Sequence, residues 1–210
     1  MVTHKSLFNA GPLTAERILD ATEDVLRRFG PLKTTVIDVA RLLRVSHGSV
    51  YRHFAHKNAL LDSVLERWLS RLSGPLAVIA AEPGPAPERL RRWFDVMIRV
   101  LRSKAREDPD LFATYVAMAA ETGIAFQAHG DRLRTHLAKI LDDGLRQGQF
   151  QITDPHAAGA ALLDATVRFH HPLHAGEWSE TNIDREFEAV WSLAMRGLEA
   201  RGSETARPRF

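Results

Sequence analysis

The chain has 210 residues, of which 45% are hydrophobic and 26% charged, and its formal net charge is +2. This composition is typical of a globular protein with one sizeable core, or with a small head on a larger body. The absence of cysteine excludes disulfides, thiolate metal ligands and cysteine nucleophiles. The sequence shows neither an apolar run of the ~18 residues needed to span a bilayer nor a signal-peptide pattern. We therefore expect a bacterial-type cytoplasmic protein without a membrane partner.

Positive charge is concentrated in the N-terminal third of the chain. Residues 1–74 contain 11 Lys and Arg against 7 Asp and Glu, whereas the remainder has an acidic excess. The segment from Ala40 to Leu61 contains no Asp or Glu, but it carries three arginines, three histidines and one lysine. An acid-free basic segment of this kind is typical of a surface that contacts nucleic acid.

The N-terminal third is predicted to be helical from end to end after a flexible arm, residues 1–13. Thr14 is a good N-cap for a first helix that Gly30-Pro31 should stop. Thr34-Thr35 opens a second helix, and Ser46 caps a third. A fourth helix starts at Ala55-His56-Lys57 and is kinked or ended by Gly74-Pro75.

The rest of the chain also shows helical periodicity, after a proline-rich linker at residues 82–87 that cannot lie inside a helix. We therefore predict an all-α protein of about nine helices. It has an arm (1–13), a head with its connecting helix that carries the basic segment (14–74), a larger helical domain (75–200) and a flexible tail (201–210). The helices of the larger domain are expected at about 87–106, 109–127, 131–148, 155–171 and 180–200.

The second and third helices have the features of a helix-turn-helix, in which one helix enters the major groove and the other braces it. Val36, Val39, Ala40 and Leu43 form the buried stripe of the bracing helix. The recognition helix begins with the short residues His47-Gly48-Ser49, which let its backbone approach phosphates and base edges.

The motif Val45-Ser46-x-Gly48-Ser49-Val50-Tyr51-x-His53-Phe54-x(2)-Lys57, with Thr34-Thr35 upstream, resembles the DNA-binding head of the TetR/AcrR repressors over residues 14–62. One position departs from the pattern, because Arg44 stands where the family's turn usually has glycine, and a left-handed conformation strains arginine. The predicted DNA-binding residues are Thr34, Thr35, Arg44, Ser46, His47, Gly48, Ser49, Tyr51, Arg52, His53 and Lys57.

The resemblance implies a homodimeric repressor that reads a palindromic operator on double-stranded DNA and is released by a small-molecule effector. It also implies that residues 14–74 bind DNA and that residues 75–200 form a regulatory and dimerisation domain, whose last two helices build the dimer interface. Their apolar residues could instead close the core of a single chain. The candidate interface residues are Leu162, Leu163, Phe187, Val190, Trp191 and Leu198.

An effector is expected among the middle helices, although aromatic and methionine side chains also fill ordinary helical cores. Tyr115 is the best single candidate, because a buried phenol needs a hydrogen-bond partner. The candidate ligand-binding residues are Trp93, Phe94, Met97, Phe112, Tyr115, Met118, Phe126, His136, Ile140, Phe169 and His170.

The histidines of the second half allow a further hypothesis. His170, His171 and His174 are close in sequence, and with His129 they form a candidate site for a divalent metal. Contact with the effector and a purely structural role remain open for them. The alternatives to an effector-released repressor are therefore a metal-responsive regulator and a helical protein–protein adaptor.

No catalytic residues are predicted. The sequence has no glycine-rich phosphate loop, no serine nucleophile elbow and no His-Glu-x-x-His motif. The acid pairs Glu23-Asp24 and Asp142-Asp143 are adjacent on helices, where neighbouring side chains point about 100° apart, so they do not form catalytic dyads. We expect a protein that is not an enzyme and requires no cofactor.

Overall fold

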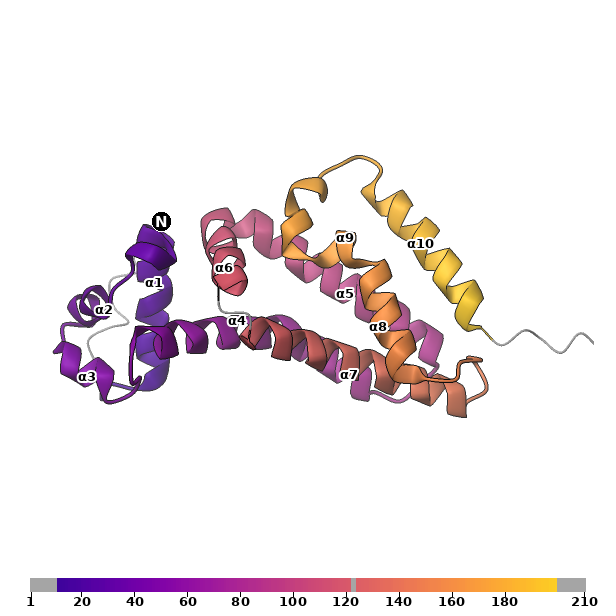
Figure 1. Ribbon diagram of the computed structural model, residues 1–210, viewed down its shortest axis with the longest axis horizontal. Helices are drawn as coiled ribbons and strands as arrows, with labels where there is room; N and C mark the ends of the chain where they lie inside the picture. The colour runs from indigo at the N-terminus through magenta and orange to yellow at the C-terminus, as the bar shows by residue number, and fades with distance from the viewer. Residues whose placement is uncertain (1–10, 122–123, 200–210) are drawn as a thin grey trace, which may run out of the picture. The chain divides into compact units, whose positions relative to one another are not determined.

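The computed structural model describes residues 11–121 and 124–199, and within them the chain is built of helices (Figure 1). No β-strand occurs in this part, only an isolated antiparallel bridge between Phe150 and Glu199. No helix in it is long and apolar enough to cross a membrane. Most of the predicted arm and the predicted tail lie outside the described residues. The helices are α1 (Ala15–Lys33), α2 (Val36–Leu43), α3 (His47–Tyr51), α4 (Lys57–Ala81), α5 (Ala86–Glu107), α6 (Pro109–Glu121), α7 (Ile124–Arg146), α8 (Pro155–Ala165), α9 (Val167–His170), η1 (Pro172–Glu177, a 3₁₀ helix) and α10 (Ile183–Leu198).

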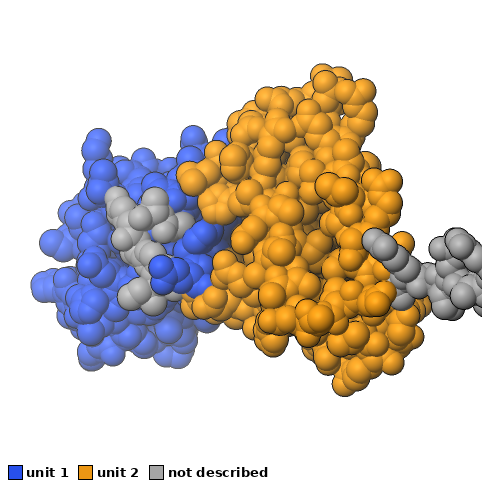
Figure 2. Space-filling model, turned by 45° about the vertical axis from the view of Figure 1, so that its right-hand side comes forward, with its two compact units in different colours: residues 1–70, 104–127 blue, residues 71–103, 128–210 orange. Residues whose placement is uncertain are grey.

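The chain forms two compact units (Figure 2). Unit 1 consists of residues 1–70 and 104–127, and unit 2 of residues 71–103 and 128–210. Unit 1 therefore combines α1–α3 and the first half of α4 with α6, which comes from much later in the sequence. The predicted boundary near residue 75 divides the chain into continuous stretches, and this division stays a prediction.

Side-chain caps start the three helices of the head. The hydroxyl of Thr14 accepts a hydrogen bond from the backbone N–H of Arg17, and that of Thr35 accepts one from Asp38. Such caps satisfy N–H groups that have no partner inside the helix. The regular part of α1 ends at Gly30, whose φ of 70° interrupts the helix where the sequence predicted a stop.

The core of unit 1 joins the head to α6. The predicted stripe of α2 is buried, as are Ile18, Val25 and Leu26 of α1, whereas Phe29 near the end of α1 is 52% exposed. Trp68 of α4 stacks on Tyr115 of α6 with ring centroids 4.4 Å apart. These contacts make α6 part of the same packed unit as the DNA-binding head.

Unit 2 is organised around α5, whose residues Trp93 and Phe94 are completely buried. Arg89 is also buried, and its guanidinium donates to the carbonyls of Ile79 and Ala80 at the end of α4 and to Asp143 of α7. Burial alone would raise the pKa of Asp143, but hydrogen bonds from Arg89 and Arg146 hold it below its ordinary value. One buried cation therefore ties three helices together.

Several predicted boundaries differ from the structure. Helix α4 continues through Gly74-Pro75 to Ala81, so this pair does not end it. Helix α7 begins at Ile124, earlier than the predicted start at residue 131. The helix expected over 155–171 is divided at Thr166, whose hydroxyl is buried and donates to the carbonyl of Leu162. Hydroxyls that bond back to the preceding turn compete with the regular backbone pattern, which explains the break.

Candidate nucleic-acid interface and the regulatory body

The exposed face of α3 is the first element of the candidate DNA-binding site. Ser46 caps the helix by accepting from the N–H of Ser49, and the two hydroxyls lie 2.9 Å apart. His47 and Tyr51 are exposed, and their rings meet edge to face at 6.2 Å. Val50 is fully buried and anchors the helix from below. One side of α3 is therefore fixed in the core while the other presents polar groups.

Gly48 has no structural reason within the protein to be glycine. A Cβ at this position would meet only the Ser46 hydroxyl oxygen, at an ordinary contact distance of 3.8 Å, and Gly48 is not among the residues with positive φ. Glycine inside a helix costs up to about 1 kcal/mol relative to alanine. Nothing in the described structure therefore requires glycine at this position.

The turn between α2 and α3 contains Arg44 in the left-handed conformation, with φ 57° and ψ 41°. It is the only residue other than glycine with positive φ in the described part of the chain. This confirms the strain expected from the sequence. Its N–H donates to the carbonyl of Arg41, and its side chain, which belongs to the acid-free segment, is exposed.

Two predicted DNA-binding residues have different surroundings from those expected. Thr34 is 1% exposed and its hydroxyl donates to the carbonyl of Gly30, so its side chain is not available to DNA. Lys57 donates through Nζ to the carbonyls of Pro31 and Leu32 at the end of α1. Both side chains position the head in this structure, because they satisfy carbonyls that α1 leaves unpaired.

All the predicted DNA-binding residues except Thr34 are at least partly accessible. Thr35 and Ser46 cap helices, and Nη2 of Arg52 lies 3.3 Å from the Ser49 hydroxyl. His56, which the sequence did not select, caps α4 by accepting from the N–H of Ala59. The half-buried or exposed members of the set are Thr35, Arg44, Ser46, His47, Gly48, Ser49, Tyr51, Arg52, His53 and Lys57.

Arg67 of α4 fixes the head through α1, and sequence reasoning missed it. Its guanidinium donates to Glu16, Asp20 and Glu23, at distances from 2.7 to 3.0 Å. Burial alone would lower the pKa of Arg67, but these carboxylates raise it above its ordinary value. The sequence signal was the i, i+4 spacing of Glu16 and Asp20, which places both on one face of α1.

The predicted ligand-binding residues are not gathered in one unit. Four belong to unit 1 (Phe112, Tyr115, Met118 and Phe126) and seven to unit 2 (Trp93, Phe94, Met97, His136, Ile140, Phe169 and His170). In unit 1, Phe112 and Tyr115 pack against Trp68, as core residues do. In unit 2, Trp93 and His136 meet edge to face at 6.5 Å.

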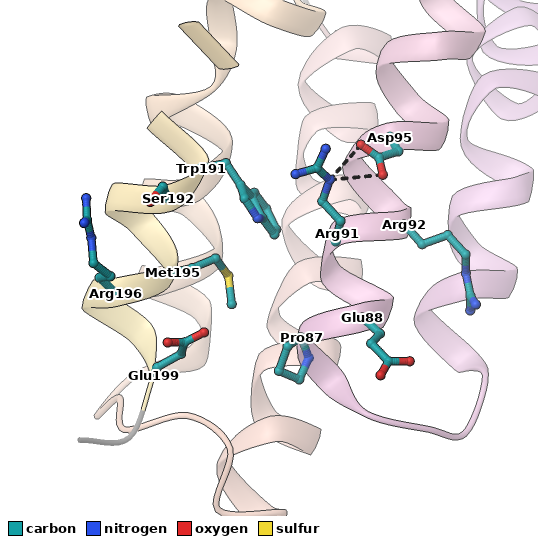
Figure 3. A pocket seen from close by; sticks show the side chains of 10 residues that line it. All are labelled: Pro87, Glu88, Arg91, Arg92, Asp95, Trp191, Ser192, Met195, Arg196 and Glu199. Atoms are coloured by element: carbon teal, nitrogen blue, oxygen red, sulfur yellow. Dashed lines mark hydrogen bonds and ion pairs between the residues drawn. The ribbon is translucent and has the colours of Figure 1, made fainter. Parts of the chain in front are cut away.

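An open groove of about 660 Å³ lies between α5 and α10 in unit 2 (Figure 3). None of the predicted ligand-binding residues lines it. Arg91 is its central cation and is fully engaged, since it donates to Asp95 and Glu188 and lies 5.5 Å from the ring centroids of Phe187 and Trp191. This ion-pair network joins α5 to α10.

The histidines do not assemble into a metal site in the structure. No group of three or more metal-ligating side chains occurs in residues 11–121 and 124–199. Nε2 of His170 lies 3.2 Å from both the Thr166 hydroxyl and the Leu163 carbonyl, and burial lowers its pKa to about 4. His171 accepts from the N–H of Leu173, His174 pairs with Glu177, and His129 is buried on α7. Local bonds therefore occupy ring nitrogens that a metal would need.

The candidate dimer residues are largely buried within unit 2 itself. Phe187 packs against Phe169 and Trp191, and Trp191 also packs against Phe94. These side chains close the core of one chain, which was the alternative that the sequence left open. Leu162, Leu163, Phe187, Trp191 and Leu198 are buried, and Val190 is half-buried. The exposed apolar residue of α10 is Leu193, at 69% exposure.

The helical head with an exposed, acid-free recognition helix on a larger helical body defines a helix-turn-helix transcriptional regulator. Residues 18–64 match the model described as "Bacterial regulatory proteins, tetR family", and residues 86–191 match "Tetracyclin repressor-like, C-terminal domain". The second match alone covers half of the chain. The chain belongs to the TetR family.

Similar proteins agree with this assignment. The HTH-type transcriptional repressor Rv3405c of Mycobacterium tuberculosis is 37% identical over 169 residues, which cover 68% of this chain and 90% of that protein. Among solved structures, SmeT, the repressor of the Stenotrophomonas maltophilia multidrug efflux pump SmeDEF, has a TM-score of 0.67 at 23% identity and covers 90% of this chain and 92% of SmeT. FadR from Bacillus subtilis, in complex with stearoyl-CoA, has a TM-score of 0.65 at 17% identity, and the match covers 88% of this chain and 99% of FadR. These structures share the fold.

Proposed function

We propose that the protein is a dimeric repressor that binds a palindromic operator through α3 and leaves it when a small molecule binds the helical body. The observation that carries the DNA-binding part is Gly48, a helical glycine on the exposed face that nothing in the protein requires. The surrounding segment has no acid to repel phosphates. Such a regulator acts in the bacterial cytoplasm, and no enzymatic activity or obligatory cofactor forms part of this proposal.

Dimerisation is supported by the surfaces that α8 and α10 leave uncovered. Leu193 is exposed on α10, and Ala157, Ala161 and Ala165 are exposed at i, i+4 spacing on one face of α8. Small side chains let two helices approach closely, so these faces suit a helix–helix interface with a second copy. Two heads on one dimer would then reach successive major grooves about 34–36 Å apart.

Effector control is supported by the structural relatives and by the composition of unit 1. SmeT has been solved in complex with triclosan and FadR in complex with stearoyl-CoA, and both of these proteins share the fold of this chain. In this chain α6 packs with the head, through the ion pair of Arg27 with Asp108 and the stacking of Trp68 on Tyr115. A movement of α6 would therefore change the packing of the head, provided that the effector binds the two states with different affinity.

Neither alternative function gains support from an observation here. A helical adaptor would not need the exposed glycine of α3, and the histidines of the metal-responsive regulator do not come together. A screen that measures thermal stability with small molecules and with divalent metals would find the effector, and the best compound should weaken operator binding.

The test of DNA binding is a mobility shift with the DNA upstream of the protein's own gene, at two salt concentrations. Tyr51→Ala should weaken binding to this DNA and to unrelated DNA alike and flatten the salt dependence, because it removes a phosphate contact. Val78→Ala, at an exposed position of α4, is the control. Unchanged affinity and salt slope for Tyr51→Ala would contradict the assignment.

A further inference from the structure

Two neighbouring rings of unit 2 carry buried nitrogen atoms that have no hydrogen-bond partner among the described residues. These atoms are Nε1 of Trp93 on α5 and Nδ1 of His136 on α7. Trp93 is completely buried, and the two rings are in edge-to-face contact with centroids 6.5 Å apart. Buried polar groups are nearly always hydrogen-bonded, so two unpartnered nitrogens on neighbouring rings require an explanation.

Buried apolar side chains flank this pair on both helices. On α7, Leu133 and Ile140 lie on the same helical face as His136 and are buried. On α5, Met97 lies one turn after Trp93 and is also buried. The pair is therefore a polar spot beside buried apolar side chains, a combination that is usual in small-molecule sites.

The chemistry of the two nitrogens restricts the ligand. An indole N–H only donates, so it needs an acceptor atom. Burial lowers the pKa of His136, and the nearby charge of Arg132 lowers it further, so this imidazole is neutral at pH 7. A neutral imidazole nitrogen either accepts or donates, so an oxygen atom suits both nitrogens.

We propose that Trp93 and His136 form the polar end of the effector site, and that the effector is an uncharged, largely apolar molecule carrying one hydroxyl or carbonyl oxygen. That oxygen accepts the hydrogen bond of the Trp93 indole and pairs with Nδ1 of His136. This inference rests on the proposed function, since it specifies the molecule that the helical body receives. Both nitrogens are shielded from solvent, so the side chains of α5 and α7 must move apart for the ligand to enter.

The test follows the indole N–H resonances of the full-length ¹⁵N-labelled protein during titration with four probes: 4-ethylphenol, acetophenone, ethylbenzene and benzoate. The chain has four tryptophans, and the spectrum of Trp93→Phe assigns the resonance of Trp93. We expect a saturable shift of that resonance with 4-ethylphenol or acetophenone, and the stronger of the two identifies a hydroxyl or a carbonyl. Ethylbenzene and benzoate should bind at least about tenfold more weakly, because they lack the oxygen or carry a charge.

Two variants complete the test. Trp93→Phe removes the N–H, and His136→Phe removes Nδ1 while keeping a ring of similar size. Each should weaken binding of the oxygen probe about tenfold. Thermal unfolding establishes that they fold, and His136→Phe supplies the test if Trp93→Phe does not. A Trp93 resonance that no oxygen probe moves, equal binding of ethylbenzene, tightest binding of benzoate, or wild-type affinity in the folded variants would each overturn the proposal.

A separate mobility shift distinguishes this inference from the function on which it rests. A probe that moves the Trp93 resonance but leaves operator binding unchanged supports the site and contradicts release by effector. A probe that does both supports the site and the release together. Failure of the protein to bind operator DNA would contradict the function of the head, while the resonance titration would still decide the site.

Discussion

At the scale of single residues, Gly48 lowers the stability of α3 but, in our proposal, allows the DNA backbone to approach closely. The glycines with positive φ among the described residues are required by the backbone, as Gly30 is at the break in α1. Gly48 has no such requirement, and neither does Gly130 inside α7, where a Cβ would meet only the end of the flexible Arg134 side chain, at 3.3 Å. The two positions therefore form a matched pair, one on the recognition helix and one away from it.

We predict that Gly48→Ala raises the free energy of unfolding by up to about 1 kcal/mol, because alanine favours the helix. The added methyl group should at the same time weaken operator binding at least about tenfold, by preventing close approach of the DNA backbone. Urea unfolding and mobility shifts measure the two effects. Gly130→Ala should give a similar gain in stability with unchanged DNA affinity, and a Gly48→Ala protein that binds DNA like the wild type would refute the interpretation.

At the scale of elements, we expect Arg89 to contribute more to the free energy of unfolding than any exposed ion pair of unit 2. Its side chain is 3% exposed and connects the end of α4 with α5 and α7. Removing one partner of a buried pair leaves the other charge uncompensated, which typically costs about 3–5 kcal/mol. Exposed pairs contribute much less, at most about 1 kcal/mol.

Arg89→Leu should therefore lower the free energy of unfolding by about 3 kcal/mol, and the double variant Arg89→Leu, Asp143→Leu should recover part of this loss. Chemical unfolding of the two variants measures it. Arg92→Leu, on the same helix but with a side chain 50% exposed, should cost less than about 1 kcal/mol. Equal losses for Arg89→Leu and Arg92→Leu would contradict the role of burial.

The short helix α9 introduces a dependence of stability on pH. Burial lowers the pKa of His170 to about 4, against 6.5 in the unfolded chain, and the charges of His171 and His174 act in the same direction. Below pH 6.5 the unfolded chain takes up a proton that the folded protein does not, so stability is complete above pH 6.5 and decreases as the pH falls toward 4.

Between pH 7 and pH 5 the wild type should lose about 1–2 kcal/mol more stability than His170→Gln, which cannot titrate in this range. Urea unfolding at the two pH values measures the difference. His129, whose pKa burial lowers to about 4, contributes in the same way in both proteins and so cancels. Identical pH dependence in the wild type and His170→Gln would show that His170 does not titrate differently on unfolding.

At the scale of the whole molecule, the proposed dimer depends on residues that face away from the core. Leu193→Glu places a charge at the exposed position of α10 that we assign to the interface, and Val78→Glu makes the same change at a 60% exposed position of α4. Leu193→Glu should be monomeric in light scattering and bind operator at least about 100-fold more weakly, because one head contacts only half a site. A dimeric Leu193→Glu protein would contradict this interface.

The fold class, the capped helices of the head and the strained turn at Arg44 could be predicted from the amino-acid sequence alone. These features depend on local rules, namely the helical period, side-chain caps and the steric limits of φ, which operate within a few residues. The motif around the recognition helix also lies within one short stretch of sequence, and it was sufficient to indicate the family.

Which face of each helix in the second half of the chain is buried could be learned only from the three-dimensional packing. Periodicity shows that Phe187, Trp191 and Leu193 lie on an amphipathic helix, but not whether a given residue meets its own chain or the surface. Three further features bring together residues that are far apart in sequence. They are the inclusion of α6 in unit 1, the hydrogen bonds of Arg89 to α4 and α7, and the proximity of the unpartnered nitrogens of Trp93 and His136. Packing between distant segments fixes such contacts, and no local pattern encodes them.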